Sequence, residues 1–250
     1  MQLSSVIIKT TKCVLFYILS SGGGSTLMFT QEVMAALHTI INEMKKHYGL
    51  TKVRMLDVPC GDMQWMSRFL ETRDDIDYTG FDIVPHLIEH HRQEYAGRPW
   101  TFRHVDIVTD PNFVNNYDLI LLRMMLQHLE NAAVLKVLRK LSAKIRHPSF
   151  LLATTFSNRR KNVDLNTQSK GRFRLLNLEL PPFRLEPPLC LFVDGPAKYH
   201  HYLGLWRLPL MTLPESSCDE NRSATISTSF STDTLYSCRS WEMPATSRHI

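Results

Sequence analysis

The sequence predicts an α/β fold in which a doubly wound, mostly parallel sheet is covered by helices on both faces. Five apolar segments of strand length alternate with four segments whose apolar residues recur at helical spacing. Residues 117–122 are apolar almost throughout, as expected for a central parallel strand. The 250 residues are 44% hydrophobic and 21% charged, which is enough apolar material to bury the core of one domain.

The elements are expected in a regular order along the chain. A first helix is predicted over 31–48, with Thr30 as its N-cap and Gly49 as its stop, because apolar residues recur there every three to four positions. Residues 189–193 and 203–209 are expected to pair as an antiparallel edge at the C-terminal side of the sheet. The five preceding strands are predicted at 53–58, 77–82, 100–105, 117–122 and 149–155, with helices after the first strand, at 85–95 and at 131–146.

The predicted domain covers residues 21–213. Residues 1–20 form an uncertain leader, whose apolar run at 13–19 has the length of a signal-peptide core but no clear cleavage site. A cytoplasmic location is therefore expected, with a signal peptide as the alternative. No stretch reaches the ~20 apolar residues of a membrane-spanning helix. Residues 214–250 are rich in Ser and Thr and are expected to be disordered.

Charge and cysteine spacing argue against several classes of function. The net charge is +5 and the basic residues are scattered without an accompanying aromatic ladder, so no nucleic-acid partner is predicted. The five cysteines are widely spaced and include no Cys-x-x-Cys pair. This spacing argues against a disulfide framework and against a zinc site, and it favours a reducing compartment. No His, Asp or Glu cluster has metal-ligand spacing, so no metal is predicted.

The most informative stretch runs from residue 53 to residue 66. A short apolar run ends in Asp57, a tight turn follows at Pro59-Cys60-Gly61, and a helix can begin soon afterwards. A strand that leads into a helix N-terminus presents unpaired backbone N–H groups and a partial positive charge. The junction therefore suits an anionic or strongly polar ligand.

This stretch resembles motif I of the class I S-adenosylmethionine-dependent methyltransferases. Leu56-Asp-Val-Pro-Cys-Gly-Asp-Met-Gln-Trp-Met66 matches, without a gap, the Asp-x-Pro-Cys-Gly-Asp-x-x-Trp-Met form found in one uncharacterised group of that family. The common form is Asp-x-Gly-x-Gly-x-Gly, so Pro59 and Met63 replace its first and third glycines. A structural strand-turn-helix junction would read similarly, and the acids that follow favour the functional interpretation.

Acids close the second and third strands as well. Asp82 follows Asp57 by 25 residues and ends the predicted second strand. In doubly wound folds, an acid at the end of strand 2 accepts hydrogen bonds from a ribose diol. Its alternative role is to cap the helix that begins at Pro85. Asp106 closes strand 3, where the family binds adenine. The resemblance implies a Rossmann-like fold, S-adenosylmethionine as cofactor, and cofactor contacts from Asp57, Pro59, Cys60, Gly61, Asp82, Ile83, Asp106, Ile107 and Arg123.

Candidate catalytic residues follow strand 4. In the resembling group this region reads Arg-Asp-x-Leu-x-His-Leu, and here Arg123 and His128 are present while Met124 replaces the acid. His128 is the candidate general base, and Arg123 can pair with an anionic group. The predicted function is methyl transfer to a small-molecule or other acceptor. The alternative is a catalytically inactive member of the same fold with a binding or regulatory role; an NAD-type enzyme is less expected, because Gly-x-Gly-x-x-Gly is absent.

Overall fold

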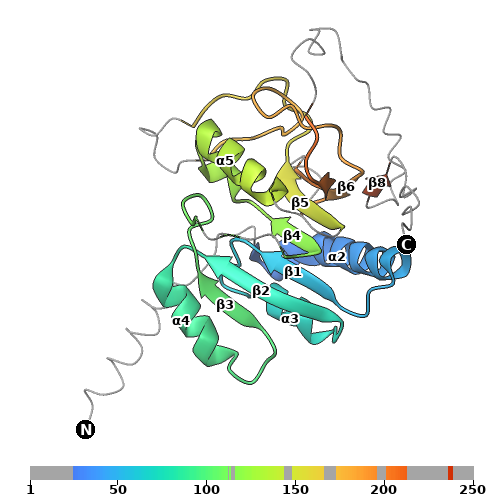
Figure 1. Cartoon of the computed structure of the whole chain (residues 1–250), viewed down its shortest axis with the longest axis vertical. Helices are drawn as coiled ribbons and strands as arrows, with labels where there is room; N and C mark the ends of the chain where they lie inside the picture. The colour runs from blue at the N-terminus through green and yellow to red at the C-terminus, as the bar shows by residue number, and fades with distance from the viewer. Residues whose placement is uncertain are drawn as a thin grey trace.

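The computed structural model describes residues 25–111, 113, 116–143, 148–165, 173–195, 201–212 and 236–238. Its described strands form one eight-stranded sheet in the order β3-β2-β1-β4-β5-β7-β6-β8 (Figure 1). The first five strands run parallel, and β7, β6 and β8 add an antiparallel edge. The strands are β1 (Val53–Asp57), β2 (Ile76–Asp82), β3 (Thr101–His104), β4 (Leu119–Leu122), β5 (Ser149–Thr155), β6 (Cys190–Val193), β7 (Tyr202–Leu208) and β8 (Tyr236–Cys238).

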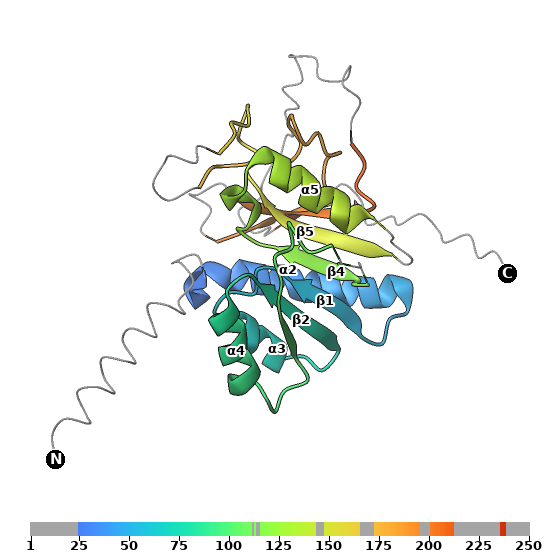
Figure 2. The same ribbon diagram turned by 60° about the vertical axis from the view of Figure 1, so that its left-hand side comes forward.

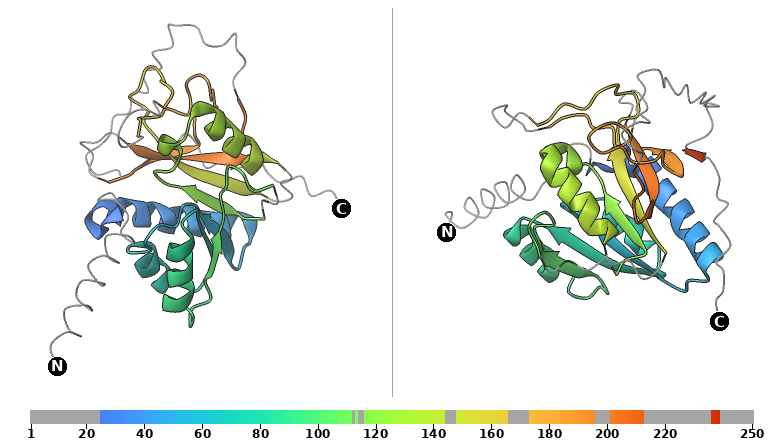
Figure 3. Two further views of the ribbon diagram at one scale, coloured as in Figure 1. Left: turned by 90° about the vertical axis from the view of Figure 1, so that its left-hand side faces the viewer. Right: turned by 45° about the horizontal axis from the view of Figure 1, so that its top comes forward.

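Helices cover both faces of the sheet, as the sequence predicts. One apolar core joins α2, α3 and α4 to one face, and a second core joins α5 to the other. Figure 3 shows α2 and α5 on opposite sides of the strands, and Figure 2 shows α4 beside β2 and β3. Among the described residues no helix is both long and apolar enough to cross a bilayer. The helices are α2 (Leu27–Tyr48), α3 (Met66–Glu71), α4 (Pro85–Glu94) and α5 (Asn131–Ser142), with a 3₁₀ turn η2 (Leu126–His128).

The first helix begins earlier than the sequence suggests. Thr26 occupies the N-cap position, and Thr30, the predicted cap, lies inside α2 and is fully buried. Its hydroxyl donates to the carbonyl oxygen of Thr26 at 3.1 Å, a bond that lets a threonine sit within a helix. The predicted stop is confirmed, because Gly49 adopts a left-handed conformation with φ of 64°.

The antiparallel edge extends further than predicted. Tyr236–Cys238, in the stretch expected to be disordered, forms β8 and pairs with β6. Cys190 and Cys238 form a disulfide across this pair, so the prediction against disulfides is wrong here. Spacing gave no signal because the two cysteines are 48 residues apart and meet only through strand pairing.

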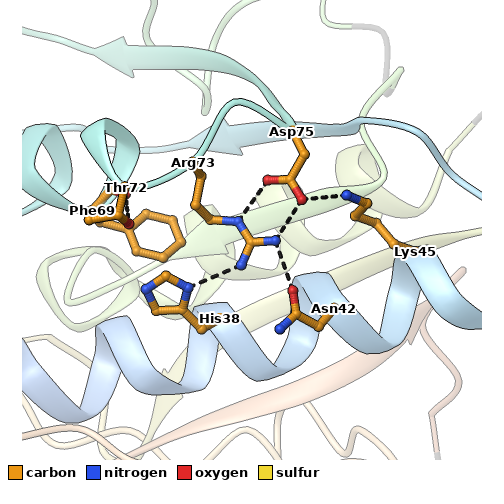
Figure 4. Close-up of polar contacts among 7 residues, drawn as sticks. All are labelled: His38, Asn42, Lys45, Phe69, Thr72, Arg73 and Asp75. Atoms are coloured by element: carbon orange, nitrogen blue, oxygen red, sulfur yellow. Dashed lines mark hydrogen bonds and ion pairs between the residues drawn. The ribbon is translucent and has the colours of Figure 1, made fainter.

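A polar cluster ties α2 to the loop that precedes β2, at the end of the sheet opposite the carboxyl ends of the parallel strands (Figure 4). Arg73 donates from Nε and Nη2 to the two carboxylate oxygens of Asp75, at 2.7 Å each. The same guanidinium reaches Asn42 and His38 on α2, and Lys45 of α2 contacts Asp75 at 2.5 Å. The hydrogen bonds from Arg73, followed by those from Lys45, hold the pKa of Asp75 well below its ordinary value.

The lowered pKa predicts acid-sensitive stability. A depressed folded-state pKa adds stability that is fully present above the unfolded value of ~3.9 and is lost as pH falls below it. Asp75→Asn should lower the free energy of unfolding at pH 7 by about 1–2 kcal/mol. The same substitution should also make the free energy of unfolding fall less steeply between pH 5 and pH 2, as measured by urea denaturation. Asp74→Asn, at an exposed neighbour, is the matched control, and equal behaviour of the two variants would contradict the assignment.

Candidate functional site

The carboxyl ends of the parallel strands meet at one rim of the sheet, where the predicted site residues lie. Strand order reverses between β1 and β4, and ligands of open α/β sheets bind at such a reversal. The turn after β1 is fixed to both neighbouring strands, because Val58 N donates to Leu121 O and Cys60 N donates to Phe81 O. Pro59 is exposed, whereas the Cys60 side chain is buried. Only the backbone of Cys60 can therefore face a ligand.

Gly61 is held from both sides. Its φ of 55° is the left-handed conformation that glycine adopts without strain. Its N–H donates to Asp82 Oδ2 at 3.2 Å, and its carbonyl lies 2.6 Å from Nε2 of His91. His91 is 1% exposed, and burial lowers its pKa, so the ring is neutral at pH 7 and donates from Nε2. The sequence does not indicate this support for the turn.

Asp82 faces the turn rather than capping a helix. Its second oxygen, Oδ1, accepts a hydrogen bond from Val84 N at 3.0 Å, and the N-cap position of α4 belongs to Val84. A carboxylate has about four acceptor positions, so two remain after these bonds. Ile83, the next residue, is a large apolar side chain that is 59% exposed. Asp82 and Ile83 together present an oriented carboxylate beside an exposed apolar side chain.

Asp57 lies beneath the turn and is almost completely buried. Tyr78 donates its hydroxyl hydrogen to Asp57 Oδ2 at 3.0 Å. Burial raises the pKa of Asp57 to about 7, against the opposing effects of the Tyr78 hydrogen bond and the positive charge of Arg123. The nearby charge of Asp82 raises it further. Asp57 and Asp82 are thus close enough to influence one another, as their places on neighbouring strands require.

The third predicted acid is engaged in its own turn. Val105 N donates to Asp82 O, which places the end of β3 beside the end of β2. Asp106 accepts hydrogen bonds from Val108 N at 2.9 Å and from the Thr109 hydroxyl at 2.7 Å. These bonds, that of Thr109 first, lower the pKa of Asp106. The side chain of Ile107 is only 2% exposed and packs in the core, so its backbone is the part that can meet a ligand.

Arg123 closes β4 and forms a buried ion pair that the sequence did not predict. Its Nε and Nη2 lie 2.8 and 2.7 Å from Asp194 Oδ1, and Asp194 is completely buried. The guanidinium carbon also lies 5.8 Å from the ring centre of Trp65, which is buried. The position of Asp194 beside Arg123 follows from the pairing of β6 with β7.

His128 lies at the outer margin of the rim. It ends the 3₁₀ turn η2, is exposed, and its ring centre lies 5.3 Å from that of Phe173. Met124, which replaces the acid of the resembling group, has a φ of 54° and donates its N–H to the Thr154 hydroxyl at 2.9 Å. Within the described part of the chain, no group of three His, Cys, Asp or Glu side chains is arranged to hold a metal ion.

Comparison with known proteins finds a matching family model and several solved structures with a similar fold. The family model described as "Methyltransferase domain" matches residues 56–147, which include the turn, Asp82, Asp106 and His128. A Burkholderia thailandensis 1,6-didemethyltoxoflavin-N1-methyltransferase, solved with bound S-adenosylhomocysteine, has a TM-score of 0.54 at 19% identity over 82% of this chain and 89% of its own. That likeness shows that the two proteins share a fold.

Two further solved structures are more distant. NodS, an N-methyltransferase from Bradyrhizobium japonicum WM9, has a TM-score of 0.48 at 14% identity over 70% of this chain and 87% of its own. The plantazolicin methyltransferase BpumL has a TM-score of 0.42 at 22% identity over 52% of this chain, which spans only 48% of BpumL. Comparison with curated proteins gives no significant sequence match.

Close packing of β2 against the turn yields a direct prediction. A Cβ added at Gly80 would lie 2.9 Å from Cys60 Cβ and 3.0 Å from the Tyr78 hydroxyl oxygen, so the turn would have to move. Gly80→Ala should lower the free energy of unfolding by about 1–3 kcal/mol, measured by urea denaturation. A Cβ added at Gly97 would have no atom within 4 Å, so Gly97→Ala is the control. Unfolding midpoints that agree for the two variants would show that β2 does not constrain the turn.

Proposed function

We propose that this chain, which carries a class I S-adenosylmethionine-dependent methyltransferase domain, transfers the methyl group of S-adenosylmethionine to a small-molecule acceptor. The observation that carries the proposal is the fixed turn at Gly61, held by Asp82 where the strand order reverses. The cofactor supplies a methyl group on a positively charged sulfur. The neighbour from Burkholderia thailandensis is named as a 1,6-didemethyltoxoflavin-N1-methyltransferase, which supports a small-molecule acceptor here.

The rim residues fit the nucleoside part of this cofactor. Asp82 is oriented by two backbone N–H groups and keeps acceptor positions for a ribose diol. Ile83 offers exposed apolar surface to the adenine ring, and burying it there returns about 25 cal/mol for each Å² of apolar area. We assign the adenine edge to Asp106 and to the backbone of Ile107, at the end of the neighbouring strand.

The turn itself suits the amino-acid part. The backbone of Pro59, Cys60 and Gly61 runs along the reversal of strand order, and we assign it to the methionine moiety. Asp57 lies beneath this turn and becomes a counter-charge for a bound cation when it ionises. Arg123 stands on the other side of the reversal, and we assign it to a negative group of the cofactor or the acceptor.

Little covalent help is needed for the transfer step. Displacement at a sulfonium carbon is accelerated chiefly by alignment and exclusion of water, which can be worth ~7–11 kcal/mol in favourable intramolecular reactions. A general base adds typically ~10²–10⁴-fold when the nucleophile is a hydroxyl. His128 was the base suggested by the sequence, together with Arg123 as its catalytic neighbour. A chain that binds the cofactor but labels no component of a cell extract would instead be the inactive binding protein, for which Met124 is the motivating residue.

Binding of S-adenosylmethionine to the purified chain tests the proposal. Isothermal titration calorimetry should detect one site, and Asp82→Ala should weaken it about 100-fold, since two hydrogen bonds to a charged group are lost. Asp77→Ala, at an exposed acid near the start of the same strand, should leave the affinity unchanged. Thermal unfolding of each variant checks that it is folded. Absence of binding, or wild-type affinity in Asp82→Ala, would refute the cofactor assignment.

The raised pKa of Asp57 predicts proton release on binding. With a pKa of about 7, Asp57 is half protonated near neutral pH, and a bound cation favours its ionised form. Titrations at pH 7 in buffers of different ionisation enthalpy should therefore show release of a fraction of a proton. Asp57→Asn should abolish that part of the release and leave any contribution from the ligand's own amino group. Identical proton release by the two proteins would exclude Asp57 as the group that titrates.

A further inference from the structure

A second histidine lies at the same rim, contributed by the antiparallel edge of the sheet. His201 directly precedes β7, and its carbonyl accepts a hydrogen bond from Asp194 N at 3.2 Å, beside the end of β6. Gly195, which follows Asp194, adopts a left-handed conformation with a φ of 80°. A Cβ at Gly195 would lie 3.6 Å from His201 Nε2 and 3.3 Å from Phe29 in the first turn of α2. His201 is thus enclosed between the sheet edge and the start of α2.

Asp194 lies beside this ring. One carboxylate oxygen, Oδ1, takes both contacts from Arg123. The other, Oδ2, accepts from the Thr154 hydroxyl at 3.4 Å and faces His201 Nδ1 at 3.7 Å. A carboxylate at Nδ1 favours the tautomer with the proton on that nitrogen and leaves Nε2 on the far side of the ring as the basic atom. Hydrogen bonds of catalytic pairs are often long without substrate, so 3.7 Å is compatible with such a pair.

Burial keeps the His201 ring neutral. Burial lowers the pKa of His201, with a further lowering from Arg123, and the negative charge of Asp194 opposes both. The net direction is downward from 6.5, so the ring is mostly unprotonated at pH 7 and can accept a proton.

A row of aromatic rings leads from the surface to this histidine. His201 stacks on Phe156, with ring centres 5.7 Å apart and planes inclined by 9°. Phe173 lies 6.5 Å from Phe156, and His128 lies 5.3 Å from Phe173. Phe156 is buried at 4% exposure, whereas Phe173 is 43% exposed. The row follows the ends of β4, β5 and β7, and flat apolar molecules pack favourably on such rings.

We propose that His201, positioned by Asp194, is the general base of the methyl transfer, and that the acceptor is a planar aromatic molecule with an ionisable hydroxyl. This inference rests on the proposed function and names the acceptor class for the same site. His201 Nε2 takes the hydroxyl proton as the acceptor oxygen forms its bond to the methyl carbon. The carbon–sulfur bond breaks, its electron pair stays on sulfur to give S-adenosylhomocysteine, and the proton leaves from His201 to solvent. His128 marks the exposed end of the aromatic row.

The test uses the full chain, methyl-tritiated S-adenosylmethionine and a panel of phenol, catechol and 2-naphthol. Wild-type protein should methylate at least one of them, with kcat rising with pH to a plateau above the pKa of His201. His201→Asn should lower kcat at pH 7 by about 100-fold or more, with an unchanged KM for the cofactor and without that inflection. His86→Asn, at an exposed position on α4 outside the site, should keep the wild-type pH profile.

Asp194→Asn tests the positioning role, because it should shift the inflection and lower kcat while cofactor affinity is retained. Saturation-transfer NMR with the same phenols on the cofactor-loaded protein provides a readout that does not need turnover. A normal kcat in His201→Asn, or a loss confined to His128→Asn, would overturn the assignment of the base. Failure of every phenol to bind or react would overturn the acceptor class. Cofactor binding measured in the same sample distinguishes either result from failure of the proposed function.

Discussion

The hydrogen bonds that fix Gly61 are the constraint on which the rest of the rim depends. The carboxylate of Asp82 holds the glycine N–H, and the buried imidazole of His91 holds its carbonyl. Asp82 ends the next strand and His91 lies in the helix after it, so the turn has its shape only when β2 and α4 are packed. Gly80 permits that packing because any side chain there would collide with Cys60. A turn fixed before a ligand arrives requires little ordering when it binds, which favours affinity.

Charge at the rim is divided between two groups of residues. Asp57 and Asp82 lie on neighbouring strands below and beside the turn, and the raised pKa of Asp57 reflects burial with a like charge nearby. On the other side of the strand reversal, Arg123 is neutralised by Asp194, which also faces His201. Asp57 and Asp82 suit a bound cation. The set formed by Arg123, Asp194 and His201 suits a ligand that exchanges a proton. Cofactor and acceptor thus meet chemically different surfaces on either side of the reversal.

The sequence predicted those parts of the fold that depend on local pattern. Apolar periodicity located the five parallel strands, and β5 has the predicted bounds, because a buried strand is apolar over its whole length. The acids at strand ends could be placed on one rim, since parallel strands end at the same edge. His91, Asp194 and His201 could not be assigned, because their roles arise from contacts between segments far apart in the chain. The same reason applies to β8 and to the pairing of Cys190 with Cys238. The N-cap was wrongly predicted at Thr30, because a threonine hydroxyl can donate to a carbonyl oxygen within a helix as well as cap the helix end.

A crystal structure of the chain grown with S-adenosylhomocysteine tests the central claim most directly. The ligand should lie across the ends of β1, β2 and β4, with its ribose hydroxyls within hydrogen-bond distance of Asp82 and its adenine against Ile83. Gly61 should keep its left-handed conformation, because the turn is already formed. Density for the ligand at another surface, or a ribose bound away from Asp82, would contradict the account.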